Sequence, residues 1–140
     1  YDNNIESVLD YGCGKGWYLP FILPININNY DPAILKWSII PKTQDYLLCI
    51  DVLEHVEPEL LSNVIEHLVS KFNKKALLII SLQEARETLP SGRNAHLTVK
   101  PDEWWIKLIK KYCVIDKIEY DYRNKKGSHN FNDLLLILKK

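Results

Sequence analysis

Residues Val8 to Gly16 read Val-Leu-Asp-Tyr-Gly-Cys-Gly-Lys-Gly, and this stretch decides the fold. A short apolar run ends at Asp10, and alternating glycines follow, among them Gly12 and Gly14. Because glycine lacks a Cβ, such a loop adopts positive φ and brings backbone N–H groups close to a ligand. A strand, a glycine-rich turn and a helix together hold nucleotide-like cofactors in doubly wound α/β folds. The acid ahead of the glycines favours a ligand with a cationic ammonium group over a pyrophosphate.

The bulk properties are those of one ordinary globular domain. The chain has 140 residues and a formal net charge of zero, so no overall field favours nucleic acid or an anionic membrane. The three cysteines lack metal-ligand spacing and are typical of reduced thiols. No apolar stretch reaches the roughly 20 residues of a membrane span, so we expect a cytoplasmic protein without membrane contact. The chain starts at Tyr1 and contains no methionine, so we expect residues 1–140 to be a single domain that lacks N-terminal residues.

Apolar runs and amphipathic stretches alternate along the chain, which indicates a mostly parallel sheet. We predict an α/β fold, a Rossmann-like three-layer sandwich with an antiparallel C-terminal strand pair joined by a turn over 123–132. Residues 34–44 are weakly patterned, so any third strand there is short. The polar stretch 83–99 is a long loop of the kind that is often functional. Strands are expected over 5–10, 25–30, 45–50, 76–82, 114–122 and 134–138, and helices over 17–23, 58–72 and 101–113.

Acids also follow two later strands of the predicted sheet. Asp31 comes 15 residues after Gly16, at the end of the second strand, where an acid can accept both hydroxyls of a ribose. A turn acid ahead of Pro32 is an equally good structural explanation. Residues 51–56, Asp-Val-Leu-Glu-His-Val, directly follow the strand at 45–50. Since ligands of open α/β sheets lie beyond the carboxyl ends of the strands, we expect this segment at the cleft.

These three segments together resemble the motifs of the class I methyltransferases that depend on S-adenosylmethionine (SAM). They are the glycine stretch, Tyr-Asp-Pro at 30–32 and Cys-Ile-Asp-Val-Leu-Glu-His-Val at 49–56, and the likeness to the family extends in order over nearly the whole chain. The resemblance implies SAM as the cofactor and an α/β fold. It further implies cofactor contacts from Gly12, Gly14 and Gly16 around the methionine part, Asp10 at its amino group, Asp31 at the ribose, and Asp51 and Val52 at the methionyl chain.

The chain departs from this family in two places. Many members contact the adenine amine with an acid that follows a clear third strand. Residues 34–44 contain no acid, and only Trp37, Ile39 and Ile40 offer apolar walls for an adenine. The helices that usually precede the first strand are also missing from this sequence, and in the family these helices contribute to the lid over the substrate.

Asp51-x-x-Glu54-His55 resembles the Glu-x-x-Glu-His signature of two metal-dependent groups in the family. These are the ubiquinone-pathway O-methyltransferases and the small-RNA 3′-terminal ribose 2′-O-methyltransferases. The second group adds a histidine from the loop after the fifth strand, where this chain has His96. The resemblance implies that Asp51, Glu54, His55 and His96 hold Mg²⁺ or Mn²⁺ with two positions open for vicinal hydroxyls. In the alternative without a metal, Glu54 caps a helix and His55 hydrogen-bonds a substrate or the backbone. His55 or His96 is then the candidate catalytic base.

The long loop carries further polar residues that would border the substrate opening. Arg86 and Arg93 suit a carboxylate or phosphate, and Asn94 lies beside them, although solvated loop side chains explain them equally well. Of the adjacent tryptophans Trp104 and Trp105, one is expected in the core because neighbouring helical positions point in different directions.

We therefore predict a SAM-dependent methyltransferase that acts on a small-molecule or nucleotide acceptor, with an oxygen atom as the expected methyl acceptor. Three other functions compete with this one. A nicotinamide-dependent oxidoreductase shares the glycine loop but has Gly-x-Gly-x-x-Gly spacing, which this chain lacks. A non-catalytic SAM-binding regulatory subunit would keep the same cofactor residues. A metal-dependent RNA ribose 2′-O-methyltransferase is the third, although the neutral net charge gives no support for extended phosphate contacts.

Overall fold

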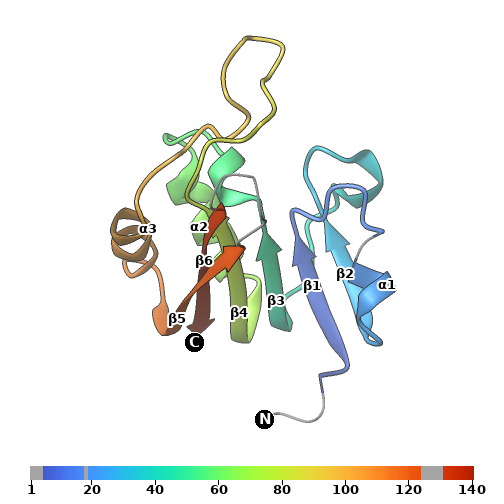
Figure 1. Ribbon diagram of the computed structural model, residues 1–140. Helices are drawn as coiled ribbons and strands as arrows, with labels where there is room; N and C mark the ends of the chain where they lie inside the picture. Colours follow the sequence, from blue (N-terminus) through green and yellow to red (C-terminus); the bar gives the residue numbers. More distant parts are fainter. Residues whose placement is uncertain (1–4, 18, 124–130) are drawn as a thin grey trace.

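The computed structural model describes residues 5–17, 19–123 and 131–140. A six-stranded mixed sheet with the strand order β2-β1-β3-β4-β6-β5 forms the centre of the molecule (Figure 1). Strands β2, β1, β3 and β4 are parallel, and β6 is antiparallel to both of its neighbours. The strands are β1 (Ser7–Tyr11), β2 (Asn26–Tyr30), β3 (Gln44–Ile50), β4 (Phe72–Ser81), β5 (Val114–Arg123) and β6 (Phe131–Lys139), and the helices are α1 (Leu19–Ile22), α2 (Leu61–Val69) and α3 (Asp102–Ile109).

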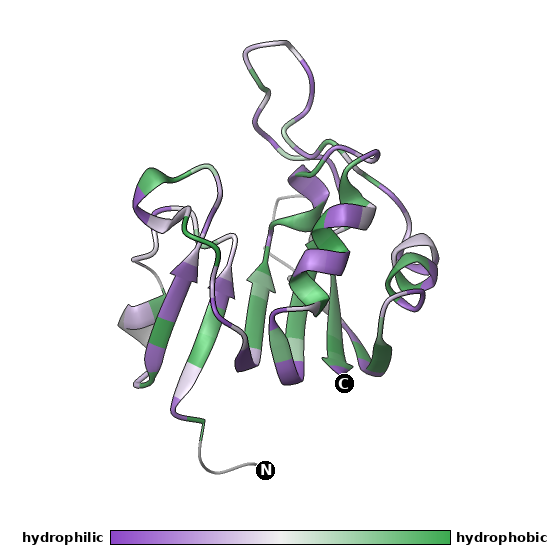
Figure 2. Cartoon of the chain, turned by 180° about the vertical axis from the view of Figure 1, so that it is seen from behind, coloured by the Kyte–Doolittle hydropathy of each residue, from purple (hydrophilic) through white to green (hydrophobic). Residues whose placement is uncertain are grey.

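One face of the sheet carries the hydrophobic core. Residues at alternate positions of the central strands are fully buried there, beneath α2 and α3, which supply Ile65, Leu68 and Trp105. The residues between them, such as Leu48, Leu77 and Ile137, point to the opposite face and are only half-buried. The short helix α1 lies on that opposite side (Figures 1 and 2). The predicted α/β fold is therefore present, with one well-covered face of the sheet and one lightly covered face.

The predicted helix over 58–72 is shorter in the structure, because α2 ends at Val69. The Ser70 N–H donates to the Glu66 carbonyl and the Ser70 hydroxyl donates to the His67 carbonyl, which satisfies the last turn of the helix. Phe72 then begins β4 opposite Gln44 and is buried there. The strand thus starts at Phe72 rather than at Ala76. The prediction placed Phe72 in the helix because an apolar residue at this position fits both the helical and the strand periodicity.

Residues 31–43 contain no strand. Their regular structure is one turn of 3-10 helix, η1 (Leu35–Trp37), after which the chain crosses to the start of β3. Consequently β2 is the edge strand at this side of the sheet. The antiparallel C-terminal pair is confirmed as β5 and β6. Most of the predicted turn at 123–132 lies outside the described residues.

In the part of the chain that the structure describes, no helix combines the length and the apolar character needed to cross a membrane. The cysteines Cys13, Cys49 and Cys113 are all free thiols.

The central position of Leu78 in the core gives a stability prediction. Leu78 is fully buried on β4, whereas Leu60, at the start of α2, is half exposed. We expect Leu78→Ala to lower the free energy of unfolding by about 2–5 kcal/mol, because the truncation leaves a cavity in the core. The matched variant Leu60→Ala should change it by less than about 0.5 kcal/mol. Urea denaturation monitored by tryptophan fluorescence measures both values, and equal losses would contradict the assignment of the core.

Candidate functional site

The glycine loop leaves β1 with its glycines in the left-handed region, at φ values of 80° for Gly12, 53° for Gly14 and 65° for Gly16. A Cβ on Gly12 would lie 2.5 Å from a methyl group of Val52, so the loop packs directly on the segment that follows β3. Around Gly14, by contrast, no protein atom lies within 4 Å of the Cβ position. The first glycine therefore serves close packing, and the second faces open space.

Asp31 joins the glycine loop to the end of β2. The Gly14 N–H donates to Asp31 Oδ2 at 2.8 Å, and the Ala33 N–H donates to Oδ1 at 2.9 Å. Asp31 is thus the turn acid ahead of Pro32, and it also fixes the glycine loop, while its contact with a ribose stays a prediction. Because each carboxylate oxygen can accept a second hydrogen bond, Asp31 still has acceptor sites for a ligand.

A cavity of ≈ 670 Å³ lies at the carboxyl ends of the parallel strands. A volume of this size is typical of sites for small molecules and cofactors. Gly12, Gly14 and Asp31 line one part of it, and Asp51, Val52 and His55 line another. The sequence prediction that the glycine loop, Asp31 and segment 51–56 meet at one cleft is therefore consistent with this geometry.

His55 and His96 are held in matching ways by the loop over 83–99. Nδ1 of His55 lies 2.9 Å from the Ala95 carbonyl oxygen, and Nδ1 of His96 is hydrogen-bonded to the Gln83 carbonyl. Since a carbonyl only accepts, both Nδ1 atoms carry the proton, and in the neutral rings Nε2 is left as an acceptor. The two rings meet edge to face with their centroids 4.7 Å apart.

Glu54 lies next to these histidines and is fully buried. Its Oε1 accepts the Ser81 N–H at 3.0 Å, while Oε2 is buried without a hydrogen-bond partner. Burial raises the pKa of Glu54 to about 7. Ligand atoms of Glu54, His55 and His96 all lie within 4.8 Å of one another, which is the spacing of a metal-binding group. Three of the four predicted ligands thus come together, and Asp51 is not part of this group.

No protein-family model matches the sequence, and a search of curated proteins also found no match. Solved structures, however, are similar in fold. The 1,6-didemethyltoxoflavin-N1-methyltransferase of Burkholderia thailandensis aligns with a TM-score of 0.67 and 15% identity, over 96% of this chain and 70% of that one. A SAM-dependent methyltransferase from Archaeoglobus fulgidus aligns with a TM-score of 0.63 and 17% identity, over 96% and 86% of the two chains.

A third similar structure is the magnesium protoporphyrin IX methyltransferase of Synechocystis with bound SAM, with a TM-score of 0.62 and 16% identity over 95% of this chain and 69% of that one. The chain has the class I SAM-dependent methyltransferase fold. At these identities the similarity concerns the fold, and the roles of individual residues rest on the geometry of the site.

Within this methyltransferase fold, three sets of residues predicted to contact the cofactor are not among those that line the cavity. Gly16 is one of them, and a Cβ there would lie 2.7 Å from Asn29 Nδ2 and 2.8 Å from Trp37 Nε1. Asp10 is buried and is not among the residues that line the cavity. Trp37, Ile39 and Ile40 border a separate hollow of ≈ 340 Å³ beside β2. The three apolar residues offered as adenine walls therefore do not border the cavity that Asp31 lines.

The far end of the cavity is lined by residues that sequence reasoning missed. Tyr11 and Tyr30 come from strand ends, and Asn63, Val64 and His67 come from α2. The Tyr11 hydroxyl and His67 Nδ1 are hydrogen-bonded at 2.7 Å. A signal was available, because Asn63 and His67 are four residues apart and so lie on one face of the helix. That face was overlooked because the apolar stripe alone defined the helix.

Asp51 adopts a φ of 54°, which makes it the non-glycine residue with positive φ in the described part of the chain. Aspartate tolerates this conformation better than most residues. Its N–H donates to the Ile79 carbonyl, which continues the β3–β4 ladder up to the cavity. The strand therefore turns sharply into the site at Asp51.

The loop over 83–99 folds as a hairpin that rises above the carboxyl ends of the strands (Figure 1). Asn94 braces it, because its side chain exchanges two hydrogen bonds with the Ala85 backbone and accepts a third from the His96 N–H. Arg93 pairs with Glu57 at 2.9 Å, so it is engaged with the protein. Near the end of the loop, Trp105 is fully buried, which confirms that one of the two tryptophans belongs to the core.

The buried carboxyl group of Asp10 gives a pH prediction for this fold. Burial and the nearby Asp31 raise the pKa of Asp10 from 3.8 to about 6. The folded state therefore holds the proton more tightly than the unfolded state. The contribution of this group to stability is fully present below about pH 4 and is lost as the pH rises through 6, by at most about 3 kcal/mol.

Asp10→Asn should remove this pH dependence. The free energy of unfolding of the variant, relative to that of the unsubstituted chain, should therefore be higher at pH 7.5 than at pH 4.5. Denaturation measured at these two pH values checks this difference. As a control, Lys139 and Lys75 lower the pKa of Asp116 below its ordinary value of 3.8, so its contribution changes below pH 4.5 and Asp116→Asn should leave the pH dependence between pH 4.5 and 7.5 unchanged. An Asp10→Asn variant that follows the same pH curve as the unsubstituted chain would contradict the prediction.

Proposed function

We propose that this protein transfers a methyl group from SAM to an oxygen atom of a small-molecule or nucleotide acceptor. The observation that carries the proposal is one cavity bordered by Gly14, by Asp31 and by His55. The similar structures include both an N-methyltransferase and an O-methyltransferase, so the fold leaves the acceptor atom open. The preference for oxygen comes from the histidine, which suits removal of a hydroxyl proton near neutral pH.

Each residue has a defined part in this proposal. The open side of the loop at Gly14, where no protein atom lies near the Cβ position, and the backbone of Asp51 and Val52 bind the methionine part of SAM. Asp31 accepts the ribose hydroxyls with its remaining lone pairs. The buried charge of Asp10 favours the cofactor's amino group from beneath the loop. Catalysis then rests on holding the acceptor oxygen, the methyl carbon and the departing sulfur in line.

His55 is the proposed base because it borders the cavity and its proton position is fixed. With Nδ1–H donating to the Ala95 carbonyl, Nε2 accepts the proton of the acceptor hydroxyl. His96 lies behind His55 and does not border the cavity. We therefore assign His96 to positioning His55 in the metal-free reaction.

A metal-dependent variant of the same reaction is the second candidate, and Glu54 favours it. A carboxylate oxygen that is buried without a partner is costly, and a bound cation would compensate for it. Both histidines present Nε2 after donating Nδ1–H to a carbonyl, which is the usual arrangement of metal-binding histidines. Glu54, His55 and His96 thus fit Mn²⁺ better than Mg²⁺, because Mg²⁺ prefers oxygen ligands to imidazole nitrogens. Such an ion would lower the pKa of an acceptor hydroxyl.

Gly14 and Gly92 form a matched pair for testing the cofactor site. Both have positive φ, at 53° and 81°, and neither has a protein atom within 4 Å of its Cβ position. Only Gly14 borders the cavity. We expect Gly14→Val to weaken binding of S-adenosylhomocysteine by at least about tenfold, since the new side chain fills the space of the ligand. Calorimetric titration measures the affinity, and Gly92→Val should leave it unchanged. Equal affinities for the two variants would contradict the proposed site.

The metal assignment has a test that does not depend on activity. We expect Mn²⁺ to bind with a stoichiometry of one, and His96→Ala to weaken binding by about tenfold or more because one of three protein ligands is lost. His67→Ala is the matched control, since His67 is hydrogen-bonded to Tyr11 rather than grouped with Glu54. Electron paramagnetic resonance of free Mn²⁺ reports the bound fraction. Absence of binding would leave the metal-free reaction with His55 as the base.

A further inference from the structure

The two edges of the sheet differ in how they are protected. An edge strand exposes unpaired backbone N–H and C=O groups, which form a ready template for a strand from another chain. Proteins usually block this with charged side chains, proline or a β-bulge. The sheet here ends at β5 on one side and at β2 on the other.

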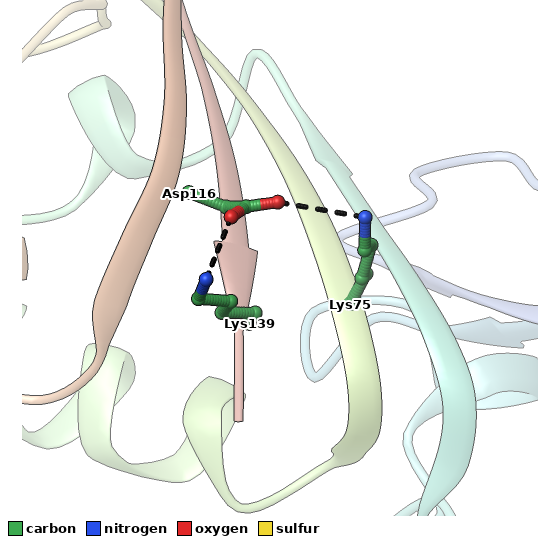
Figure 3. Close-up of polar contacts among 3 residues, drawn as sticks. All are labelled: Lys75, Asp116 and Lys139. Atoms are coloured by element: carbon green, nitrogen blue, oxygen red, sulfur yellow. Dashed lines mark hydrogen bonds and ion pairs between the residues drawn. The ribbon is translucent and has the colours of Figure 1, made fainter.

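The β5 edge carries such protection. Its pairing with β6 is irregular between Ile115 and Lys117, which marks a bulge. Asp116, at that irregularity, pairs with Lys139 at 2.9 Å and Lys75 at 3.5 Å (Figure 3). Lys117 and Glu119 form a further ion pair along the strand. Adding another strand at this edge would disturb these charged groups.

The β2 edge carries none of these devices. Its five residues, Asn-Ile-Asn-Asn-Tyr, include no charge and no proline, and its pairing with β1 is regular. Among the residues that the structure describes, β2 has β1 as its one strand neighbour. No described strand therefore occupies the outer side of β2, although the short helix α1 contacts this strand.

Large apolar side chains surround this open edge. Leu35 is 91% exposed, Ile39 is 82% exposed and Ile40 is 69% exposed, and all three belong to the segment that follows β2. Ile39 and Ile40 also border the hollow of ≈ 340 Å³ together with Ile27 of β2. A cluster of exposed aliphatic groups beside an unprotected edge is typical of an interaction surface.

We propose that β2 pairs with β2 of a second copy of this chain, in antiparallel orientation about a two-fold axis, to give one continuous sheet across a dimer. An uncharged strand meets itself without repulsion at the axis, and a two-fold interface needs a surface that complements itself. Ile39 and Ile40 of each copy would then be covered by the other. The proposal is independent of the methyltransferase function.

The charges at the two ends of β2 also bear on the orientation. Lys36 lies in the turn that follows β2, and Lys42 lies with Gln44 and Ile27 near the start of β2. Antiparallel pairing brings Lys42 of each copy toward Lys36 of the other, which is repulsive. Replacement of Lys42 by glutamate should therefore strengthen the dimer.

Sedimentation velocity over a wide range of protein concentration tests the dimer. A pairing of five-residue strands with a small apolar surround is smaller than a standard interface, so we expect a dissociation constant in roughly the micromolar range. The double variant Ile39→Asp/Ile40→Asp should weaken it by at least about tenfold. Lys42→Glu should strengthen it by about threefold. Val114→Asp, at the exposed start of the opposite edge strand β5, is the matched control and should change nothing.

Hydrogen exchange gives a second readout that needs no variant. Raising the protein concentration should slow exchange of β2 amides and leave those of β5 unchanged. A monomer at all concentrations would overturn the proposal. A dimer that responds to Val114→Asp, or one that ignores the changes at Ile39, Ile40 and Lys42, would overturn it as well.

Discussion

The close approach of Gly12 to Val52 is the constraint on which the site depends. The 2.5 Å between a Cβ position on Gly12 and a Val52 methyl leaves no room for any other residue there. This contact presses the loop after β1 onto the segment after β3. Asp31 then fixes the same loop from the other side through the Gly14 N–H. The cavity exists because these two contacts hold three strand ends together while leaving Gly14 open.

A second constraint comes from Glu54, which brings a carboxyl group into the core at an energetic cost. One oxygen is used by the Ser81 N–H at the end of β4, so Glu54 links η2 (Leu53–His55) to the sheet. Thr98 ties the end of the long loop to the same turn, because its N–H donates to the Glu54 carbonyl and its hydroxyl donates to the Val56 carbonyl. The other Glu54 oxygen stays without a partner. Such a buried polar atom calls for a partner from outside the chain, such as a bound ion or a water molecule.

The sequence was sufficient for the order of elements and for the loop of the site. Alternating glycines after an apolar run indicate a loop with positive φ. Acids that directly follow two further strands lie at the carboxyl edge of the sheet, where ligands bind, so both patterns locate the site from the sequence. The predicted C-terminal end of α2 was wrong because Phe72 suits both a helix face and a buried strand. The predicted start was also wrong, because residues 58–60 form a turn and the helix begins at Leu61. Contacts between distant segments were beyond sequence reasoning. The backbone carbonyls of Ala95 and Gln83 accept hydrogen bonds from the two histidines. These contacts depend on how the loop folds, and backbone carbonyls leave no signal in the sequence.

The central claim is that the cavity between Gly14, Asp31 and His55 holds a SAM-type cofactor. Calorimetric titration of the unsubstituted chain with S-adenosylhomocysteine, and separately with NADH, tests it most directly. We expect S-adenosylhomocysteine to bind at one site per chain and NADH to give no measurable heat. Binding of NADH alone, or of neither compound, would contradict it, because the glycine loop would then serve another cofactor or only the packing of the fold.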